Sequence, residues 1–303
     1  MADRRLQVFH AVAKQLSFTK AAEVLFMTQP AVTFQIKQLE EHFDTRLFDR
    51  GHGKISLTPA GELVLDYAER ILNLSSEMDV RLGEMTRQIG GPLLVGGSTT
   101  IAEFLLPRIL GEFKSAYPSV QPRLIVGNSE TIENRVAEHT LDIGIIESYS
   151  HQQNLQCENC CADELQVICS PGSPLAKSAE LTAADLVRHP YVSRESGSGT
   201  REVTDHYFQE QGVPPQSLNL AMELGSPEAL KGVVETGLGF AIVSRASVVK
   251  ELELGTLVTI PLNPRLTRTL AMIYPKERFR SRLVNTFVDF AVSKLKSAIA
   301  KSA

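Results

Sequence analysis

The chain has 303 residues, a formal net charge of −4 and 43% hydrophobic residues. This length suggests about two domains, and the composition is that of an ordinary soluble globular protein. Residues 1–60 differ from the remainder, because eight Lys and Arg residues outnumber six Asp and Glu residues there. Any contact with nucleic acid is therefore expected at the N-terminus, and the acidic remainder should not bind phosphates by itself.

The residues after Met1 do not show the basic segment followed by an apolar segment that is typical of a signal peptide. No apolar run approaches the length that is needed to span a membrane. These features predict a cytoplasmic protein without a membrane partner.

Residues 18–37, FTKAAEVLFMTQPAVTFQIK, predict two short helices joined by a tight turn, after a first amphipathic helix over residues 6–13. Thr19 and Thr28 are placed to cap the two helix starts, and Pro30 lies in the first turn of the second helix, where its missing N–H costs nothing. This second helix has an apolar stripe and a separate face with a hydroxyl, a ring and a cation. The stripe is Val32, Ile36, Leu39 and Phe43, and the face is Pro30, Thr33, Phe34 and Lys37. The pattern is typical of a DNA-binding helix-turn-helix, although any helical hairpin has a buried stripe and a solvated face.

Residues 47–57 predict two short strands around a basic, glycine-punctuated turn, the pattern of a hairpin wing. Arg50, His52 and Lys54 would contact the phosphate backbone or the minor groove, where they position a protein without specifying sequence. The alternative is a solvated surface hairpin.

A long helix is predicted to follow, because Thr58, Pro59 and Glu62 form a cap, a proline at the first helical position and an acid in the first turn. Its apolar residues recur with a mean step of about 3.6, the period of a nearly straight helix. They are Val64, Tyr67, Ile71, Leu74, Met78, Leu82, Met85 and Ile89. Pairing with the same helix of a second subunit would cover this stripe, as would packing on the chain's own C-terminal part.

Gly90–Pro92 break this helix and indicate a hinge, after which strands alternate with helices. The predicted strands cover residues 93–97, 122–127, 141–146, 163–169, 191–193, 220–224, 240–243 and 270–274. The predicted helices cover residues 102–117, 131–138, 181–187, 200–211, 227–236 and 281–297. This order predicts an α/β domain of two lobes with a cleft between them. The domain division is then 1–58, 59–89, 90–92 and 93–303.

Two strand-to-helix turns are candidates for binding an anion. One is Ser98-Thr99-Thr100, and the other is the segment ESGSGTR from Glu195 to Arg201, which contains Ser198 and Thr200. Such turns expose backbone N–H groups at the positive end of a helix, and Arg201 adds a cation. The second segment lacks the third glycine of a dinucleotide fingerprint, and no base is identifiable for a nucleophilic serine. Ordinary helix capping is the alternative for each serine and threonine.

The cysteines Cys157, Cys160, Cys161 and Cys169 are interpreted as free thiols in or beside a strand. Their spacing does not resemble the paired spacings of structural zinc sites. Neighbouring residues of a strand point to opposite faces, so Cys160 and Cys161 are not expected to face one ligand together. Sensing of oxidants by these thiols stays an open alternative.

Several motifs of the N-terminal part resemble those of the LysR-type bacterial transcriptional regulators, in the same order and with the same spacing. They are AA at 21–22, QPAV at 29–32, QIKQLE at 35–40, LFDR at 47–50 and LTPAG at 57–61. The resemblance implies a winged helix-turn-helix, a long linker helix and an effector domain similar to periplasmic binding proteins. It also implies a tetramer built as a dimer of dimers on an interrupted palindromic promoter site in double-stranded DNA. Each dimer is expected to pair through residues 59–89. A small molecule would alter the DNA bend, and RNA polymerase is a further candidate partner.

The resemblance also implies the residues that form each site. The DNA-facing residues that it implies are Gln29, Pro30, Thr33, Phe34, Lys37 and Arg50. The expected DNA-binding set also includes the helix caps Thr19 and Thr28 and the wing residues His52 and Lys54. The effector-binding set comprises Ser98, Thr99, Thr100, Ser129, Thr131, Glu147, Glu195, Ser198, Thr200, Arg201 and Ser226. Phe34 departs from the polar or basic residue that is usual there. The GNSETI and SGSGTR segments are most similar to the regulators of carbon fixation and inorganic sulfur assimilation, so a small anionic effector and no cofactor are expected.

Two other classes of function remain as alternatives. The C-terminal domain alone would suit a solute-binding protein without a regulatory role. An enzyme is the other, although the sequence contains no metal-ligand set, catalytic triad or cofactor fingerprint that would support one.

Overall fold

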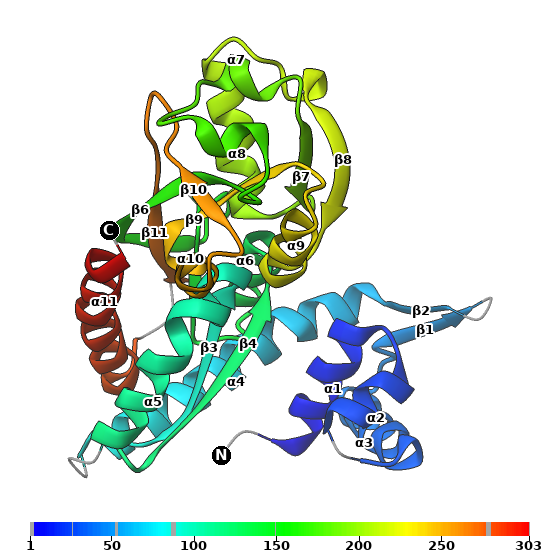
Figure 1. The fold of residues 1–303 in the computed structure, drawn as a ribbon. Helices are drawn as coiled ribbons and strands as arrows, with labels where there is room; N and C mark the ends of the chain where they lie inside the picture. The colour runs from blue at the N-terminus through cyan, green and yellow to red at the C-terminus, as the bar shows by residue number, and fades with distance from the viewer. Residues whose placement is uncertain are drawn as a thin grey trace. The chain divides into compact units, whose positions relative to one another are not determined.

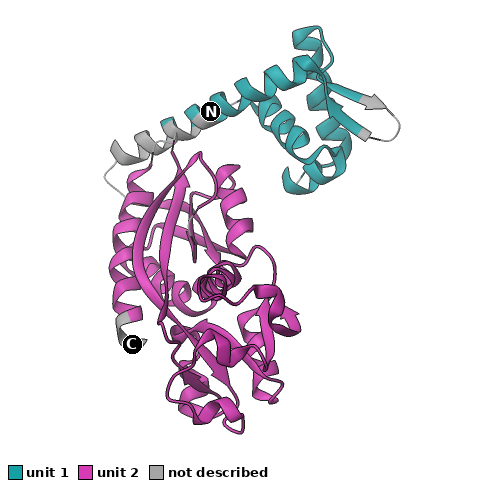
Figure 2. Ribbon diagram, turned by 90° about the horizontal axis from the view of Figure 1, so that it is seen from above, with its two compact units in different colours: residues 1–88 teal, residues 89–303 magenta. Residues whose placement is uncertain are grey.

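The computed structural model describes residues 3–25, 27–51, 54–85, 89–148, 150–276 and 280–302. The chain divides into two compact units, residues 1–88 and residues 89–303 (Figure 2). Within the described ranges, none of the helices combines the length and the hydropathy that a membrane crossing requires.

The first unit is a winged helix-turn-helix followed by a long helix (Figure 1). Its elements are α1 (Arg4–Gln15), α2 (Phe18–Leu25), α3 (Gln29–Phe43), β1 (Phe48–Gly51), β2 (Lys54–Leu57) and α4 (Pro59–Met85). Strands β1 and β2 are antiparallel and form the wing. The rings of Phe9 and Phe18 lie 5.3 and 5.8 Å from that of Phe48, so the wing and the helices share one core. The predicted helix-turn-helix and hairpin wing are confirmed.

Three local expectations for this unit are wrong. Thr19 does not cap α2, because the helix begins earlier and the Lys20 N–H donates to Ser17 Oγ at 3.3 Å. Thr28 occupies the N-cap position of α3, but its side chain makes no capping hydrogen bond. Phe43 ends the predicted apolar stripe, yet it is exposed and lies against His42, since α3 ends there and the core no longer covers that face.

Two of the sequence motifs have a clear structural role in this unit. The carboxylate of Glu40 on α3 accepts hydrogen bonds from the backbone N–H groups of Leu47 and Phe48, at 2.8 and 3.3 Å. Gly61 packs so closely on the Leu47 carbonyl that an added Cβ would lie 2.1 Å from its oxygen. The wing is thus fixed to α3 by Glu40, and the start of α4 fits against it only with glycine at position 61.

Helix α4 is 27 residues long and begins as predicted, because the Gly61 N–H donates to Thr58 Oγ1 at 3.0 Å and Pro59 is the first helical residue. Several members of its apolar stripe are exposed in the single chain, namely Tyr67, Ile71, Leu74 and Met78. The side chains of Leu82 and Met85 lie outside the described residues.

The second unit is built on one nine-stranded mixed sheet with the order β4-β3-β5-β11-β6-β9-β7-β8, and β10 pairs with β6. Its strands are β3 (Gly91–Ser98), β4 (Val120–Gly127), β5 (Ile143–Ile146), β6 (Leu155–Cys169), β7 (Pro190–Arg194), β8 (Asn219–Leu224), β9 (Phe240–Ser244), β10 (Val258–Ile260) and β11 (Leu266–Pro275). Its α-helices are α5 (Leu106–Ala116), α6 (Ser129–Ala137), α7 (Ala183–Leu186), α8 (Gly199–Glu210), α9 (Pro227–Glu235), α10 (Val249–Leu254) and α11 (Arg282–Ser302). A short π-helix, Ile101–Leu105, links β3 to α5.

The second unit has two lobes, which share the long strands β6 and β11 (Figure 1). In the first lobe, α5 and α11 cover one face of the sheet and α6 covers the other. In the second lobe, the sheet is packed between α7 and α8 on one side and α9 and α10 on the other. This arrangement confirms the predicted α/β domain of two lobes.

The observed strands differ from the expected ones in several places. Strand β3 begins at Gly91, so two of the three residues of the expected hinge already pair with β4. Strand β6 is longer than predicted and contains Cys157, Cys160 and Cys161. In addition, β10 and α10 were not predicted.

The expectation that Cys160 and Cys161 face opposite sides is wrong. Cys161 pairs with Leu270 and Asn159 pairs with Ala271, so Cys160 is the extra residue of a β-bulge. A bulge interrupts strict alternation. Both cysteines consequently contact the same apolar cluster of the first lobe.

Candidate functional site

The candidate DNA-reading face is the outer side of α3. Gln29, Pro30, Phe34 and Lys37 are exposed there, as is Thr28 before the helix, and Phe34 leaves 57% of its surface open. Gln29 Nε2 donates to Thr33 Oγ1 at 3.1 Å, which orients the side chain along the helix. Lys37 Nζ lies 3.5 Å from Glu41 in an exposed pair, a contact that a phosphate can replace at little cost.

The wing residues predicted to contact DNA cannot be placed in the same way. His52 lies outside the described residues, and so do the side chains of Arg50 and Lys54. Their predicted contacts with the DNA backbone stay predictions. Thr19 is exposed on α2.

Most of the predicted effector-binding residues gather where the two lobes meet. Helix α6 of the first lobe and α8 of the second begin side by side, because the Glu130 N–H donates to the Gly197 carbonyl at 3.2 Å. Next to it, Asn128 Nδ2 donates to the Ser196 carbonyl at 3.2 Å. The two helix N-termini therefore place their positive ends together.

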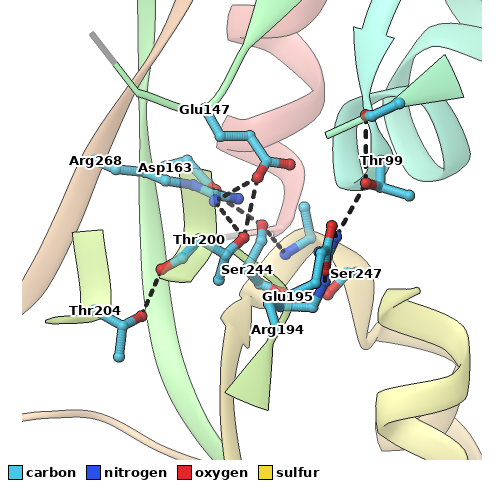
Figure 3. Close-up of polar contacts among 12 residues, drawn as sticks. Thr99, Glu147, Asp163, Arg194, Glu195, Thr200, Thr204, Ser244, Ser247 and Arg268 are labelled. Atoms are coloured by element: carbon cyan, nitrogen blue, oxygen red, sulfur yellow. Dashed lines mark hydrogen bonds and ion pairs between the residues drawn. The ribbon is translucent and has the colours of Figure 1, made fainter. Parts of the chain in front are cut away.

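A buried ionic network lies between the lobes (Figure 3). Arg268 on β11 donates to Glu147 Oε2 at 3.1 Å and to Asp163 Oδ2 at 2.8 Å. It also donates to Thr200 Oγ1 at 2.8 Å, and the Thr200 hydroxyl donates to Glu147 Oε2 at 3.0 Å. This links the end of β5 in the first lobe to the start of α8 in the second.

The network holds its groups charged despite burial. Burial raises the pKa of the Glu147 carboxyl, but Arg268, Thr100, Arg194 and Thr200 oppose this effect and the net shift is downward. Burial lowers the pKa of the Arg268 guanidinium, while Glu147 and Asp163 raise it above its usual value.

A second cation, Arg194 on β7, is also engaged across the lobes (Figure 3). It holds Glu195 with two hydrogen bonds, at 2.8 and 3.0 Å, and donates to Thr99 Oγ1 at 3.0 Å. Sequence reasoning selected Thr99 and Glu195 but missed Arg194, which precedes the recognisable segment by one residue.

A cavity of about 460 Å³ lies between α6 and α8. It is lined by Ser129, Glu130, Glu133, Asn134, Ser148, His151, Gln152, Ser196, Gly197, Ser198, Arg201, Glu202 and Asp205. Among the described residues, the buried hydroxyl oxygens of Ser129 and Ser198 have no hydrogen-bond partner. The same holds for the buried hydroxyl of Ser98, the residue before Thr99. Buried hydroxyls in proteins are normally satisfied, so these atoms call for a partner.

Only part of the predicted effector set lines this cavity. Ser129, Ser198 and Arg201 do, whereas Glu147 and Thr200 are buried in the ionic network and Thr100 lies beside it. Arg201 pairs with Glu223 and lies 3.5 Å from Asp205, so an anion must compete for it. The hydroxyl of Thr131 bonds to Asn128, and Ser226 caps α9.

Three of the four cysteines lack the features of reactive thiols, whereas the fourth, Cys157, is exposed. Burial raises the pKa of Cys160 to about 12 and that of Cys161 to about 11, so both are protonated at neutral pH. Burial also raises the pKa of Cys169. No group of three or more His, Cys, Asp or Glu residues in the described ranges could hold a metal ion.

Comparison with known proteins gives two family models that match along the chain. Residues 4–62 match the bacterial regulatory helix-turn-helix protein of the lysR family, and residues 86–296 match the LysR substrate binding domain. A probable RuBisCO transcriptional regulator of Porphyra purpurea is 36% identical over 93% of this chain and 90% of its own length. A protein of the same name from Synechocystis is 35% identical over 94% of this chain and 84% of its own length.

Solved structures agree with the fold. Full-length OxyR from Pseudomonas aeruginosa matches with a TM-score of 0.73 at 19% identity, over 98% of this chain and 95% of that chain. The CcmR regulatory domain from Synechocystis PCC6803, solved in complex with 2-PG, matches with a TM-score of 0.62 at 27% identity. That match covers 67% of this chain and 96% of the CcmR chain.

Proposed function

Because the chain belongs to the LysR family of transcriptional regulators, we propose that α3 reads promoter DNA and that a small anion between the lobes controls this binding. Regulators of this family bind promoter DNA, oligomerise and respond to small molecules. The exposed polar face of α3 supports the assignment of Gln29, Thr33 and Lys37 to base and phosphate contacts. Phe34 is suited to a thymine methyl group.

The observation that carries the effector proposal is the pair of buried, unpartnered hydroxyls of Ser129 and Ser198, two residues that line the cavity. They lie at the adjacent N-termini of α6 and α8, where two helix dipoles favour negative charge. The complex of CcmR with 2-PG supports a phosphorylated anion as the class of ligand. The effector then has to break or replace the contacts of Gly197 and Ser196 with α6.

The test is a titration of the full-length protein with 2-PG and with inorganic phosphate. A ligand of the folded state raises the melting temperature by mass action. Ser198→Ala removes one hydroxyl and should weaken binding by about tenfold if the hydroxyl contacts a charged group. Ser115→Ala, which removes an exposed hydroxyl on α5, is the matched control and should leave binding unchanged. Equal affinity of the Ser198 variant and the control would place the anion elsewhere.

The exposed stripe of α4 supports assembly through residues 59–89. Leu74 and Tyr67 leave 64% and 52% of their surfaces open in a single chain, and pairing of two α4 helices would bury them. Two paired helix-turn-helix units fit an interrupted palindromic site, and a second pair would complete a tetramer. The chain would act in the cytoplasm as a regulator and not as an enzyme, with RNA polymerase as a further partner.

The names of the relatives support genes of carbon fixation as targets. A gel shift at several salt concentrations on the chain's own upstream region and on RuBisCO promoters tests this proposal. Sequence-specific binding should persist at salt concentrations that abolish non-specific binding. Loss of binding to every site at the same salt concentration would contradict it.

A further inference from the structure

A short segment, residues 46–48, lies between the recognition helix α3 and the long helix α4 and is hydrogen-bonded to both. On the side of α3, the Glu40 carboxylate accepts hydrogen bonds from the N–H groups of Leu47 and Phe48, at 2.8 and 3.3 Å. Leu47 and Phe48 are both buried. Loss of the carboxylate would therefore leave two N–H groups of buried residues without this acceptor.

The same segment is bound to the start of α4 through Thr58. The Thr58 N–H donates to the Leu47 carbonyl at 3.1 Å, and the Thr58 hydroxyl donates to the Arg46 carbonyl at 2.8 Å. The oxygen of that hydroxyl accepts from the N–H of Gly61, in the first turn of α4, at 3.0 Å. Residues 46–48, together with Glu40 and Thr58, thus connect α3 to α4, and we call this group the α3–α4 joint.

The hydrogen bonds of the joint restrict the direction of α4 more than its other contacts do. Ala68 of α4 lies in the core of the first unit, and Lys14 on α1 lies 2.8 Å from Glu69 of α4 in a partly exposed pair. Apolar contacts have no preferred direction and exposed ion pairs contribute little, so both tolerate a tilt of one helix against another. Hydrogen bonds weaken steeply when their angle changes. The joint therefore resists a change in the angle between α3 and α4.

Helix α4 converts a small change of this angle into a large displacement because of its length. Its 27 residues span roughly 40 Å, at about 1.5 Å per residue. A tilt of about 10° at its start moves its far end by roughly 7 Å, which is the rise of about two base pairs. The exposed apolar residues Tyr67, Ile71 and Leu74 lie along this helix. In a dimer paired through them, the angle at the joint determines the distance between the two α3 helices.

We propose that the α3–α4 joint, through Glu40 and Thr58, selects the spacing between the two half-sites of the DNA. Both are positioning residues, which need no contact with a base because they act through the direction of α3 relative to α4. The inference rests on the proposed pairing through α4 and adds a determinant of specificity outside the DNA-facing surface. Without either side of the joint, α3 and α4 can tilt, and a dimer accepts half-sites at several spacings with similar affinity.

The experiment measures the affinity of the full-length protein for duplexes with two copies of a half-site at different spacings. The half-site is selected by the wild-type protein from a random duplex library, and one to three base pairs are then inserted or removed between the copies. Each base pair rotates one half-site by roughly 35° and shifts it by roughly 3.4 Å relative to the other. The wild-type protein should lose about tenfold in affinity at the first change of spacing, because the DNA has to deform to realign the half-sites.

The variants Glu40→Ala and Thr58→Val release the joint from its two sides. Each should reduce the loss at altered spacing to about threefold, since the protein and not the DNA then adapts, and should keep the affinity for a single half-site. Glu40→Gln retains an oxygen that can accept from both N–H groups and should keep most of the preference. Glu23→Ala, which removes an exposed carboxylate on α2, is the matched control and should keep all of it. If Glu40→Ala does not fold, Thr58→Val tests the joint from the side of α4.

The outcomes separate the joint from the pairing of subunits. A wild-type preference for spacing that survives in both Glu40→Ala and Thr58→Val overturns the role of the joint. Equal losses for the single half-site and for the paired sites also overturn it, because the two residues then only stabilise the DNA-binding unit. A wild-type protein that binds paired sites more tightly than single ones, but equally at all spacings, overturns the inference and leaves the pairing intact. Paired sites that bind no more tightly than a single half-site overturn both.

Discussion

The outer face of α3 and the site between the lobes are both polar, but they differ in how their charges are satisfied. On α3, Lys37 has one exposed intrahelical partner at 3.5 Å, and Phe34 lies uncovered. Between the lobes, Arg268 and Arg194 are buried. Arg268 is held by two carboxylates and a threonine hydroxyl, and Arg194 by one carboxylate and a threonine hydroxyl. The exposed groups of α3 are available to an external partner, whereas the buried arginines between the lobes are already paired with groups of their own chain.

This difference indicates how a signal would act on each site. DNA bound at the face of α3 would add contacts there and displace few existing ones. An effector between the lobes has to exchange contacts, because Thr200 with Glu147, Gly197 with Glu130 and His151 with Glu202 all join one lobe to the other. A ligand that changes these contacts changes the relative stability of lobe arrangements, which is the requirement for a switch.

The largest effect is expected from Arg268→Leu. This substitution leaves Glu147 and Asp163 buried without their cation, and removal of one partner of a buried ion pair costs about 3–5 kcal/mol. The free energy of unfolding of the second unit, measured by urea denaturation, should fall by that amount.

Arg265→Leu is the matched control for this comparison. Arg265 forms a surface pair with Glu164 and is 63% exposed, so its removal should cost no more than about 1 kcal/mol. Similar losses for the two variants would show that the buried network is not held together as described.

The sequence predicted the first unit well because its determinants are local. The helix-turn-helix, the wing and the start of α4 depend on residues within about one or two turns of each other, and the motifs retain that spacing. The errors there are also local: Ser17 takes the capping role expected of Thr19, and Phe43 falls beyond the last covered turn.

The inter-lobe site could be predicted only in part. The two strand-to-helix turns were recognised from glycines and hydroxyls, but Arg268 and Asp163 are 105 residues apart in the chain and meet only in the folded sheet. No motif marks either residue. The prediction that Cys160 and Cys161 face opposite sides of the strand failed for a related reason, since a bulge depends on the register with β11 and not on β6 alone.

A smaller effect is expected from Gly61→Ala, which tests whether the first unit is as closely packed as the second. The added Cβ would lie 2.1 Å from the Leu47 carbonyl oxygen, so the wing has to shift, at a cost of about 1–3 kcal/mol. Hydrogen exchange should quicken in α1, α2 and α3 while the strands of the second unit keep their protection. Gly111→Ala on α5 meets no atom within 4 Å, and this control should be neutral or stabilising.

The smallest effect is expected from Lys37→Ala, which tests the exposed outer face of α3 directly. Because Lys37 makes only an exposed pair with Glu41, its removal should leave the stability of the first unit unchanged. If its ammonium contacts a phosphate, DNA affinity should fall by about fivefold and the slope of log K against log salt should decrease by about 1. Lys250→Ala, an exposed change on α10, should alter neither quantity. A Lys37 variant with the wild-type affinity and salt slope would move the DNA contact away from this face, whereas a loss confined to certain base sequences would make Lys37 a reader of guanine.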